Sequence, residues 1–425
     1  DMQPFGLKSP ALPSLLGLLL LCGLLSAPDA LALRATPRFQ HAGVDDGLSI
    51  SSVLCSAQDR DGFLWFGTYD GLNRYDGQRF VVFRNDPDNA RSLTDNNVRA
   101  LASSPDGSLW VGTKSGGLNL YPPDRSGFTA YVEGDGSGLP SNEITALLLD
   151  QSGGLLVGTS KGLAARDGDA AVFTPVLAAT PDGERLDKAQ IQSLADDGEG
   201  GVWVGTDKGL FHLAADGARL DRMAGCVPEG AAILSLMADG PHAVLAGTDT
   251  RGLFRHDTSS GSCEQHLDGA GVQAFLRDSR GNVMVGTTQG LAVSEPGPLR
   301  FRLHTHNPYD SQSLAHNDVH SLLEDSGGMI WIGTYAGGLS KYNPSYQAFG
   351  LLRHEPWDPH SISGELVSAV FLDRTGILWV GTSYHGLNRV DRTTGEVRVF
   401  RHDPDDPGSL SDDRVTSILE DSKGR

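Results

Sequence analysis

The chain has 425 residues, of which 54 are glycine, 39% are hydrophobic and 20% are charged. This length exceeds one ordinary domain unless repeats extend it, and no long polar tract indicates disorder. The formal net charge of −19 is spread along the chain and repels phosphate backbones, so we expect no nucleic-acid partner.

Residues 1–32 have the features of a secretory signal peptide. Lys8 precedes an apolar run from Leu12 to Leu25, and the segment closes with Ala30-Leu31-Ala32. A basic start, a short apolar stretch and small residues at −3 and −1 are the parts of such a signal. The alternative is a retained membrane anchor, for which this apolar run is short. We therefore predict export.

Three cysteines follow this segment, namely Cys55, Cys226 and Cys263. An odd number of cysteines spread over a long chain does not indicate a disulfide framework. Cys226 and Cys263 fall at similar positions in successive repeats, so a bridge between neighbouring repeats is one interpretation. The interpretation that we favour is three unpaired small hydrophobic side chains.

A repeat of roughly 45 residues organises the rest of the chain. Gly-Thr, followed two or three residues later by Gly-Leu, recurs eight times at intervals of 39 to 48 residues. The copies start at Gly67, Gly112, Gly158, Gly205, Gly247, Gly286, Gly333 and Gly381. In five copies a tryptophan lies two residues before Gly-Thr, at Trp65, Trp110, Trp203, Trp331 and Trp379. Such regular self-similarity indicates a repeat architecture.

Each repeat is expected to form four short antiparallel strands. In the first repeat they are 52–57, 63–68, 72–75 and 80–83. Asp59 and Gly62 suit the first reversal, because aspartate bonds to its own turn backbone and glycine accepts positive φ. Four-stranded units without intervening helices are typical of β-propeller blades, so the fold class is all-β. We expect the tryptophans to pack between blades, in preference to a sugar-stacking platform.

The eighth copy resembles the first more closely than either resembles its neighbours, and 314 residues, or seven repeats, separate them. We therefore predict a seven-bladed propeller over residues 36–345, followed by the first blade or blades of a second, truncated propeller over 346–425. Phe39-Gln40-His41 is expected to supply the outermost strand of the blade containing Gly333. Phe349 is expected to open the second ring in the same way.

These motifs resemble the two-component regulator propeller family. The family pattern Asp-x-x-Gly-x-Leu-Trp-x-Gly-Thr-x-x-Gly-Leu is almost intact at 59–72 and 373–387, whereas the fifth copy, at 239–253, departs most. The resemblance covers residues 36–425. It implies an extracytoplasmic sensor with two seven-bladed rings and a small β-sandwich, from which a membrane helix leads to a histidine kinase or diguanylate cyclase. None of those later parts is present in this sequence.

A candidate ligand site follows from propeller geometry. The loops between second and third strands share one face with the loops that lead into the innermost strands, around the mouth of the central channel. Polar residues there vary while the framework repeats, as expected of recognition loops on a rigid scaffold. The candidates are Tyr69, Asp70, Asn97, Lys114, Asn142, Lys161, Asp207, Lys208, Asp249, Arg251, His316, Asn317 and Tyr335.

Other chemistries find little support in the sequence. Asp59 with Asp61 superficially suggests a calcium loop, but the further oxygen ligands of an EF-type loop do not follow, so we expect turn formation. A Gly-x-Ser-x-Gly elbow is absent, and glycine-rich segments lie at turns instead of between a strand and a helix. Four histidines lack metal-ligand spacing: His41, His304, His306 and His316. We expect no catalytic residues, metal or cofactor in this chain.

The leading hypothesis is therefore a periplasmic input region of an inner-membrane sensor, which binds a small ligand such as an oligosaccharide and lacks its output part here. Membrane attachment would come only from a missing C-terminal region, and two rings in tandem would offer the full-length protein a dimerising surface. The alternatives are a secreted propeller lyase, which predicts clustered His and acidic or Arg residues at the channel mouth, and a protein-interaction scaffold, which predicts a large apolar patch.

Overall fold

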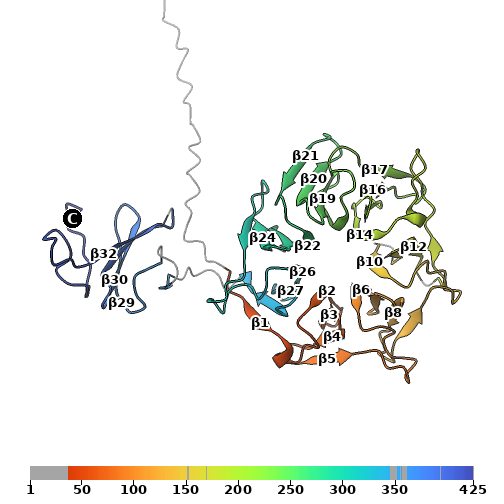
Figure 1. The fold of residues 1–425 in the computed structure, drawn as a ribbon, viewed down its shortest axis with the longest axis horizontal. Helices are drawn as coiled ribbons and strands as arrows, with labels where there is room; N and C mark the ends of the chain where they lie inside the picture. Colours follow the sequence, from red (N-terminus) through yellow and green to blue (C-terminus); the bar gives the residue numbers. More distant parts are fainter. Residues whose placement is uncertain are drawn as a thin grey trace, which may run out of the picture. The chain divides into compact units, whose positions relative to one another are not determined.

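The computed structural model describes residues 37–344 except 151, 152 and 169, and then residues 352–354, 356, 361–392 and 394–424. The chain divides into two compact units, one of Pro37–Ala348 and one of Asp1–Thr36 with Phe349–Arg425. Within the described residues, the strands form eight four-stranded sheets, and seven of these belong to the first unit. Figure 1 shows the seven sheets as blades around a common centre. The predicted all-β propeller fold is confirmed, whereas the predicted signal peptide at 1–32 and the role of Phe349 lie outside the described residues.

The strands of blades 1 to 6 follow chain order from the innermost to the outermost. Blade 1 comprises β2 (Val53–Gln58), β3 (Leu64–Thr68), β4 (Gly71–Tyr75) and β5 (Phe80–Phe83); blade 2, β6 (Val98–Ser103), β7 (Leu109–Thr113), β8 (Leu118–Tyr121) and β9 (Thr129–Tyr131); blade 3, β10 (Ile144–Leu149), β11 (Leu155–Thr159), β12 (Gly162–Arg166) and β13 (Thr174–Pro175). Blade 4 comprises β14 (Ile191–Asp196), β15 (Val202–Thr206), β16 (Gly209–Leu213) and β17 (Leu220–Arg222); blade 5, β18 (Ile233–Ala238), β19 (Ala243–Thr248), β20 (Leu253–Asp257) and β21 (Cys263–His266); blade 6, β22 (Val272–Arg277), β23 (Val283–Thr287), β24 (Gly290–Ser294) and β25 (Arg302–His304). The helical elements of the described residues are two short 3-10 turns, η1 (Val44–Asp46) and η2 (Leu186–Lys188). In blade 1 the bounds differ from the predicted ones by at most one residue.

Blade 7 closes the ring by combining the two ends of the first unit. It contains β26 (Val319–Glu324), β27 (Ile330–Thr334), β28 (Leu339–Tyr342) and, as its outermost strand, β1 (Gln40–Ala42). β1 pairs antiparallel with β28, with Gln40 opposite Lys341. The predicted role of Phe39-Gln40-His41 is confirmed, and Figure 1 shows β1 at the outer edge of this blade.

The repeated aspartate and tryptophan act as one unit. The Asp59 carboxylate accepts the backbone N–H of Asp61 at 3.0 Å and the indole N–H of Trp65 at 2.9 Å. Asp325 with Trp331 and Asp373 with Trp379 form the same indole bond, each at 2.8 Å. The aspartate therefore closes the first hairpin and orients the indole, which confirms the predicted turn role of Asp59.

The glycine of Gly-Thr lies where neighbouring blades approach most closely. A Cβ atom on Gly67 would lie 2.6 Å from Cγ1 of Val98 in blade 2, and one on Gly333 would lie 2.7 Å from Cγ1 of Val53 in blade 1. Trp65 is 1% exposed and packs with Tyr121 of blade 2, at 5.6 Å between ring centroids. The cores between blades thus depend on a glycine facing the innermost strand of the next blade and a tryptophan packed against its third strand, and the predicted packing of tryptophans between blades is confirmed.

The second unit contains a further blade of the same pattern. Its strands are β29 (Val367–Leu372), β30 (Ile377–Thr382), β31 (Leu387–Asp391) and β32 (Val397–Phe400). A Cβ atom on Gly381 would lie 2.6 Å from Cγ1 of Val415, which repeats the contact of Gly67 with Val98. The segment around Val415 therefore occupies the place of a next innermost strand, and a second propeller remains a prediction.

Candidate ligand-binding face of the propeller

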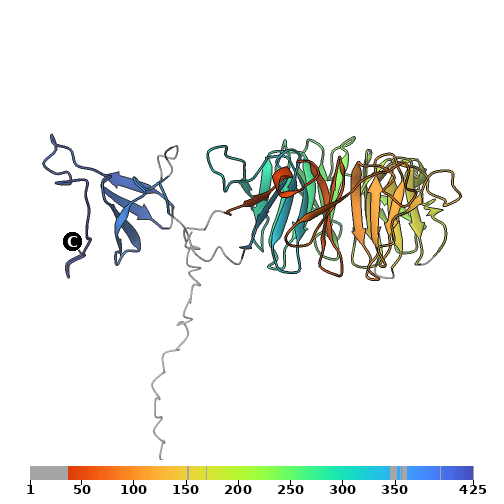
Figure 2. The ribbon, with the colours of Figure 1, turned by 90° about the horizontal axis from the view of Figure 1, so that it is seen from below.

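Two sets of loops meet on one face of the ring, which we call the mouth face. They are the hairpin loops between the second and third strands of each blade, and the inner loops that lead into each innermost strand. The backbone N–H of Lys114 in a hairpin loop bonds to the carbonyl of Asn97 in the inner loop of the same blade, at 2.9 Å. The N–H of Gly117 bonds to the carbonyl of Asn142 in the next blade at 3.0 Å. The side view in Figure 2 shows the loops gathered at the two ends of the strands.

The structure brings two of the candidate residues, Tyr69 and Tyr335, into contact on this face. Tyr69 follows β3 of blade 1 and Tyr335 follows β27 of blade 7, and their rings meet edge to face with centroids 6.2 Å apart. Tyr335 is 45% exposed, so an aromatic surface remains open to a ligand. The Ser52 hydroxyl donates to the carbonyl of Tyr335, which fixes the loop at the junction of blades 7 and 1.

Two side chains that sequence reasoning missed extend this tyrosine pair. The Arg99 guanidinium of blade 2 lies over the Tyr69 ring, 5.3 Å from its centroid. On the other side, the His320 ring of blade 7 lies 5.7 Å from the Tyr335 ring. His320 Nε2 is in turn 3.3 Å from Asp318 Oδ1. We call Arg99, Tyr69, Tyr335, His320 and Asp318 the mouth arc; it spans blades 2, 1 and 7.

The positions of Arg99 and His320 have a common backbone cause. Each is the second residue of an innermost strand, β6 or β26, and the pairing register shifts at that point. Such a β-bulge turns a side chain away from the regular alternation of a strand. The chemical consequence is an arc with aromatic faces, one guanidinium and one imidazole, which suits a polar ring-shaped ligand.

Three other candidates are engaged in ion pairs on the mouth face. Asp70 pairs with Arg84 at 2.8 Å, and Lys161 pairs with Glu133 at 2.6 Å. Lys114 pairs with Glu143 of the following blade. These exposed pairs fix loop side chains and contribute little to stability.

Several further candidates serve the loops themselves. The side-chain oxygens of Asn142 and Asn317 accept the backbone N–H groups of Glu133 and His306, at 2.7 and 2.6 Å. The remaining contacts are Asn97 Oδ1 with Arg99 Nε (2.8 Å), Asp207 Oδ1 with the N–H of Gln190 (3.3 Å), Asp249 Oδ1 with the N–H of Thr250 (2.9 Å), His316 Nδ1 with the N–H of Asp318 (3.1 Å), and the N–H of Arg251 with Thr248 Oγ1 (2.9 Å). A ligand-binding role for these residues stays a prediction. Lys208, the last candidate, lines a cavity of about 280 Å³ on blade 4.

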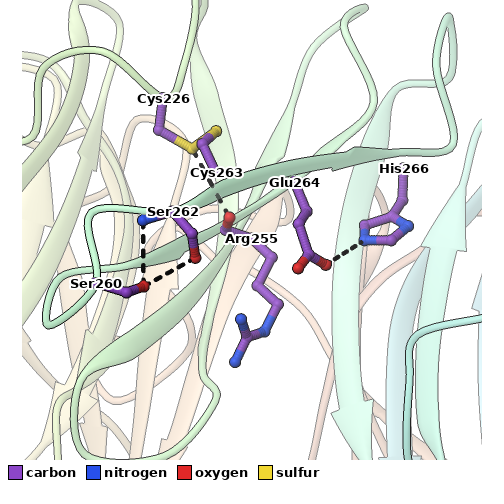
Figure 3. Close-up of a disulfide and its surroundings, with 7 residues drawn as sticks. All are labelled: Cys226, Arg255, Ser260, Ser262, Cys263, Glu264 and His266. Atoms are coloured by element: carbon purple, nitrogen blue, oxygen red, sulfur yellow. Dashed lines mark hydrogen bonds and ion pairs between the residues drawn. A yellow bond between two sulfur atoms is a disulfide. The ribbon is translucent and has the colours of Figure 1, made fainter.

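The favoured interpretation of three unpaired cysteines is wrong for two of them. Cys226 and Cys263 form a disulfide with a Cα–Cα distance of 5.3 Å. Cys226 lies in the loop after β17 of blade 4, and Cys263 begins β21, the outermost strand of blade 5, so the bridge joins neighbouring blades (Figure 3). Cys55 is unpaired, and its sulfur packs against Gly67; burial raises the pKa of this thiol to about 12.

Across the described residues, no group of three or more His, Cys, Asp or Glu side chains is arranged to hold a metal ion. The same part of the chain contains no helix that is long and apolar enough to span a membrane.

The repeats match a known family. The model of the two-component regulator propeller matches residues 47–70, 92–115, 138–161 and 313–336, which run from the inner loop to the hairpin loop of blades 1, 2, 3 and 7. A relative named Histidine kinase P4, from Formosa agariphila, is 51% identical over 49 residues. That stretch is 12% of this chain and 4% of the relative.

Solved structures share the fold. One, described as the extracellular domain of a hybrid two-component system of B. thetaiotaomicron, gives a TM-score of 0.75 at 23% identity, covering 92% of this chain and 51% of the solved chain. A second extracellular domain of that organism gives 0.61 at 22% identity, covering 91% and 50%. A streptogramin B lyase gives 0.54 at 12% identity, covering 70% and 95%. This chain therefore spans about half the length of the two solved extracellular domains.

The four matched segments are the same inner-strand, turn and Gly-Thr units that build the ring. Four of the seven blades therefore carry the repeat of the two-component regulator propeller family.

Proposed function

We propose that this chain is the extracytoplasmic ligand-sensing region of a transmembrane signalling protein, whose histidine kinase or diguanylate cyclase output lies outside the sequence given. The observation that carries the proposal is the family match of four blades in a ring whose variable loops gather on one face. The signal-like segment at 1–32 supports a periplasmic location. The relative named as a histidine kinase supports the output type.

The mouth arc is the ligand site that we propose for this function. A sugar ring would stack on the exposed face of Tyr335, and its hydroxyl groups would bond to the polar edge formed by Arg99 and His320. A bound oligosaccharide would touch blades 7, 1 and 2 at once, so its binding energy would favour one arrangement of these three blades. Ligand-dependent signalling requires this kind of differential affinity.

The experiment uses the full-length gene in its host with a reporter of the output. Tyr69→Ala with Tyr335→Ala should abolish the response to an active oligosaccharide mixture, while the protein stays folded and exported. Tyr309→Ala is the matched control, because Tyr309 is 74% exposed and lies outside the arc. An unchanged dose response in the double variant would refute the site. A secreted product without a membrane-bound output would refute the sensing function.

A lyase is the second candidate, since Arg99, His320 and Asp318 all lie at the channel mouth. Arg99 contacts Tyr69 and His320 contacts Tyr335, so the tyrosine pair separates the two basic groups. A general base and an electrophilic partner must both reach the reacting atoms, which this separation does not favour. Elimination activity on an acidic polysaccharide that is lost in His320→Ala would support the lyase instead.

A further inference from the structure

Five lysines lie in the described part of the ring, and three of them have partners. Lys114 pairs with Glu143, Lys161 pairs with Glu133, and the Lys341 ammonium lies 5.1 Å from the centroid of the Trp331 ring. The other two, Lys188 and Lys208, make no side-chain hydrogen bond or ion pair with any described residue. Both line the same cavity on blade 4.

This cavity, which we call the blade-4 pocket, has a volume of about 280 Å³ and an apolar floor. The floor consists of Leu186, Phe211 and Leu220, each at most 3% exposed. Its rim carries Lys188 and Lys208, both exposed, together with Arg185. This volume is slightly below the usual range for small-molecule sites, so the pocket fits a ligand with a single ring.

Each acidic group beside the pocket has an arginine partner, although one buried oxygen of Glu184 has no hydrogen bond and the Lys188 charge also acts on Asp187. Glu184 accepts from Arg222 at 2.7 Å, and the Asp187 carboxylate binds Arg185 through two hydrogen bonds of 2.7 and 2.9 Å. The Arg222 guanidinium also donates to the backbone carbonyl of Lys208, which fixes the loop that carries this lysine. Lys208 borders a second cavity that includes Glu229, and no ion pair joins these two described residues.

Lys188 and Lys208 therefore bring two exposed basic side chains to one cavity in a chain of net charge −19. Unpaired ammonium groups beside an apolar floor would bind a molecule with one anionic group and one apolar face. We propose that the blade-4 pocket binds a small organic carboxylate, with the carboxylate held by Lys188 and Lys208 and the ring lying on Leu186 and Leu220. The proposal is independent of the mouth arc and of the sensing function.

The test uses benzoate as the probe, with the whole chain in its oxidised form. Lysine acylation is followed by mass spectrometry at each lysine, with and without benzoate at concentrations on the order of 1 to 10 mM, where a ligand of this size is expected to bind. Benzoate should slow acylation at Lys188 and Lys208 and leave Lys114 and Lys161 unchanged. Benzyl alcohol, which lacks the charge, and inorganic phosphate, which lacks the ring, should each protect much less.

Matched variants separate this site from general electrostatic attraction. Lys188→Gln with Lys208→Gln should weaken benzoate binding, measured by ligand-observed NMR, by about tenfold or more. Lys114→Gln with Lys161→Gln changes the net charge equally and should have no effect. Equal weakening in both double variants, equal protection by phosphate, or no protection of Lys188 and Lys208 would each overturn the proposal. Failure of the mouth-arc variants to alter signalling would leave these results unchanged.

Discussion

Replacing Cys226 and Cys263 by serine is expected to lower the free energy of unfolding of the ring by about 4 kcal/mol. The two residues are 37 positions apart, and the bridge restricts the unfolded chain by closing that loop. The chain-entropy relation for a loop of this length gives about 4 kcal/mol at 25 °C. The folded ring should keep its structure, because each outer strand remains paired within its own blade, as β21 does with β20.

Equilibrium urea unfolding, followed by tryptophan fluorescence, measures this difference. The wild-type chain should lose the same free energy on reduction as on double substitution. Reductant can reach the bridge, because Cys263 is exposed and begins β21, the outermost strand of blade 5. Reductant should not affect the double-serine variant, which is the control for other effects of the reagent. A difference of less than about 1 kcal/mol between the double variant and the oxidised wild type would refute the loop-closure argument.

Three further substitutions test the contacts between blades, the closure of the ring and the burial of a histidine. Gly286→Ala should destabilise the ring by about 2 kcal/mol in urea unfolding, because the added Cβ would lie 2.8 Å from Cγ1 of Val319. Gly43→Ala is the control and should be nearly neutral, because a Cβ at Gly43 would have no atom within 4 Å. Equal effects of the two substitutions would contradict the role of Gly286 in the close approach of blades. Phe39→Ala should lower the free energy of unfolding by about 3 to 4 kcal/mol, because Phe39 is 3% exposed and contacts Tyr342 across the ring closure. Val44→Ala, at a position that is 52% exposed, should leave the free energy of unfolding unchanged. Burial, with a smaller effect of Arg302, lowers the pKa of His304 to about 4, so the folded state favours the neutral imidazole. The free energy of unfolding should therefore be highest above pH 6.5 and should decrease by about 3 kcal/mol as the pH falls towards 4. His304→Gln should remove this pH dependence. An NMR titration of His304 with a midpoint near 6.5 would contradict the lowered pKa.

The repeated sequence motif was sufficient to predict the propeller architecture, because each blade needs the same residue types at the same positions. Gly67 and its equivalents are needed for close approach, and Asp59 with Trp65 is needed to close and orient one hairpin. Closure by Phe39-Gln40-His41 was predictable because an outermost-strand pattern stood without inner strands of its own. These features depend on residues near one another in sequence or at a fixed repeat spacing.

The site was only partly predictable, since its contacts cross blades. Tyr69 and Tyr335 were placed on the mouth face by their loops, but Arg99 and His320 were missed because they lie in strands, at bulges that redirect their side chains. A charged or imidazole residue within an otherwise apolar innermost strand was the available signal. Predicting the Cys226–Cys263 bridge required the distance between the two residues in the folded ring, and their equivalent positions in successive repeats do not give that distance.

The closure of blade 7 also constrains the order in which the protein can fold during synthesis. β1 is made first, yet its partner β28 follows it by about 300 residues, so the first strand must wait unpaired while six blades form. An unpaired strand edge is a template for association with other chains. With only three residues, β1 offers a poor template during that interval. If the protein is exported as an extended chain, the ring can close only after residue 342 has crossed the membrane.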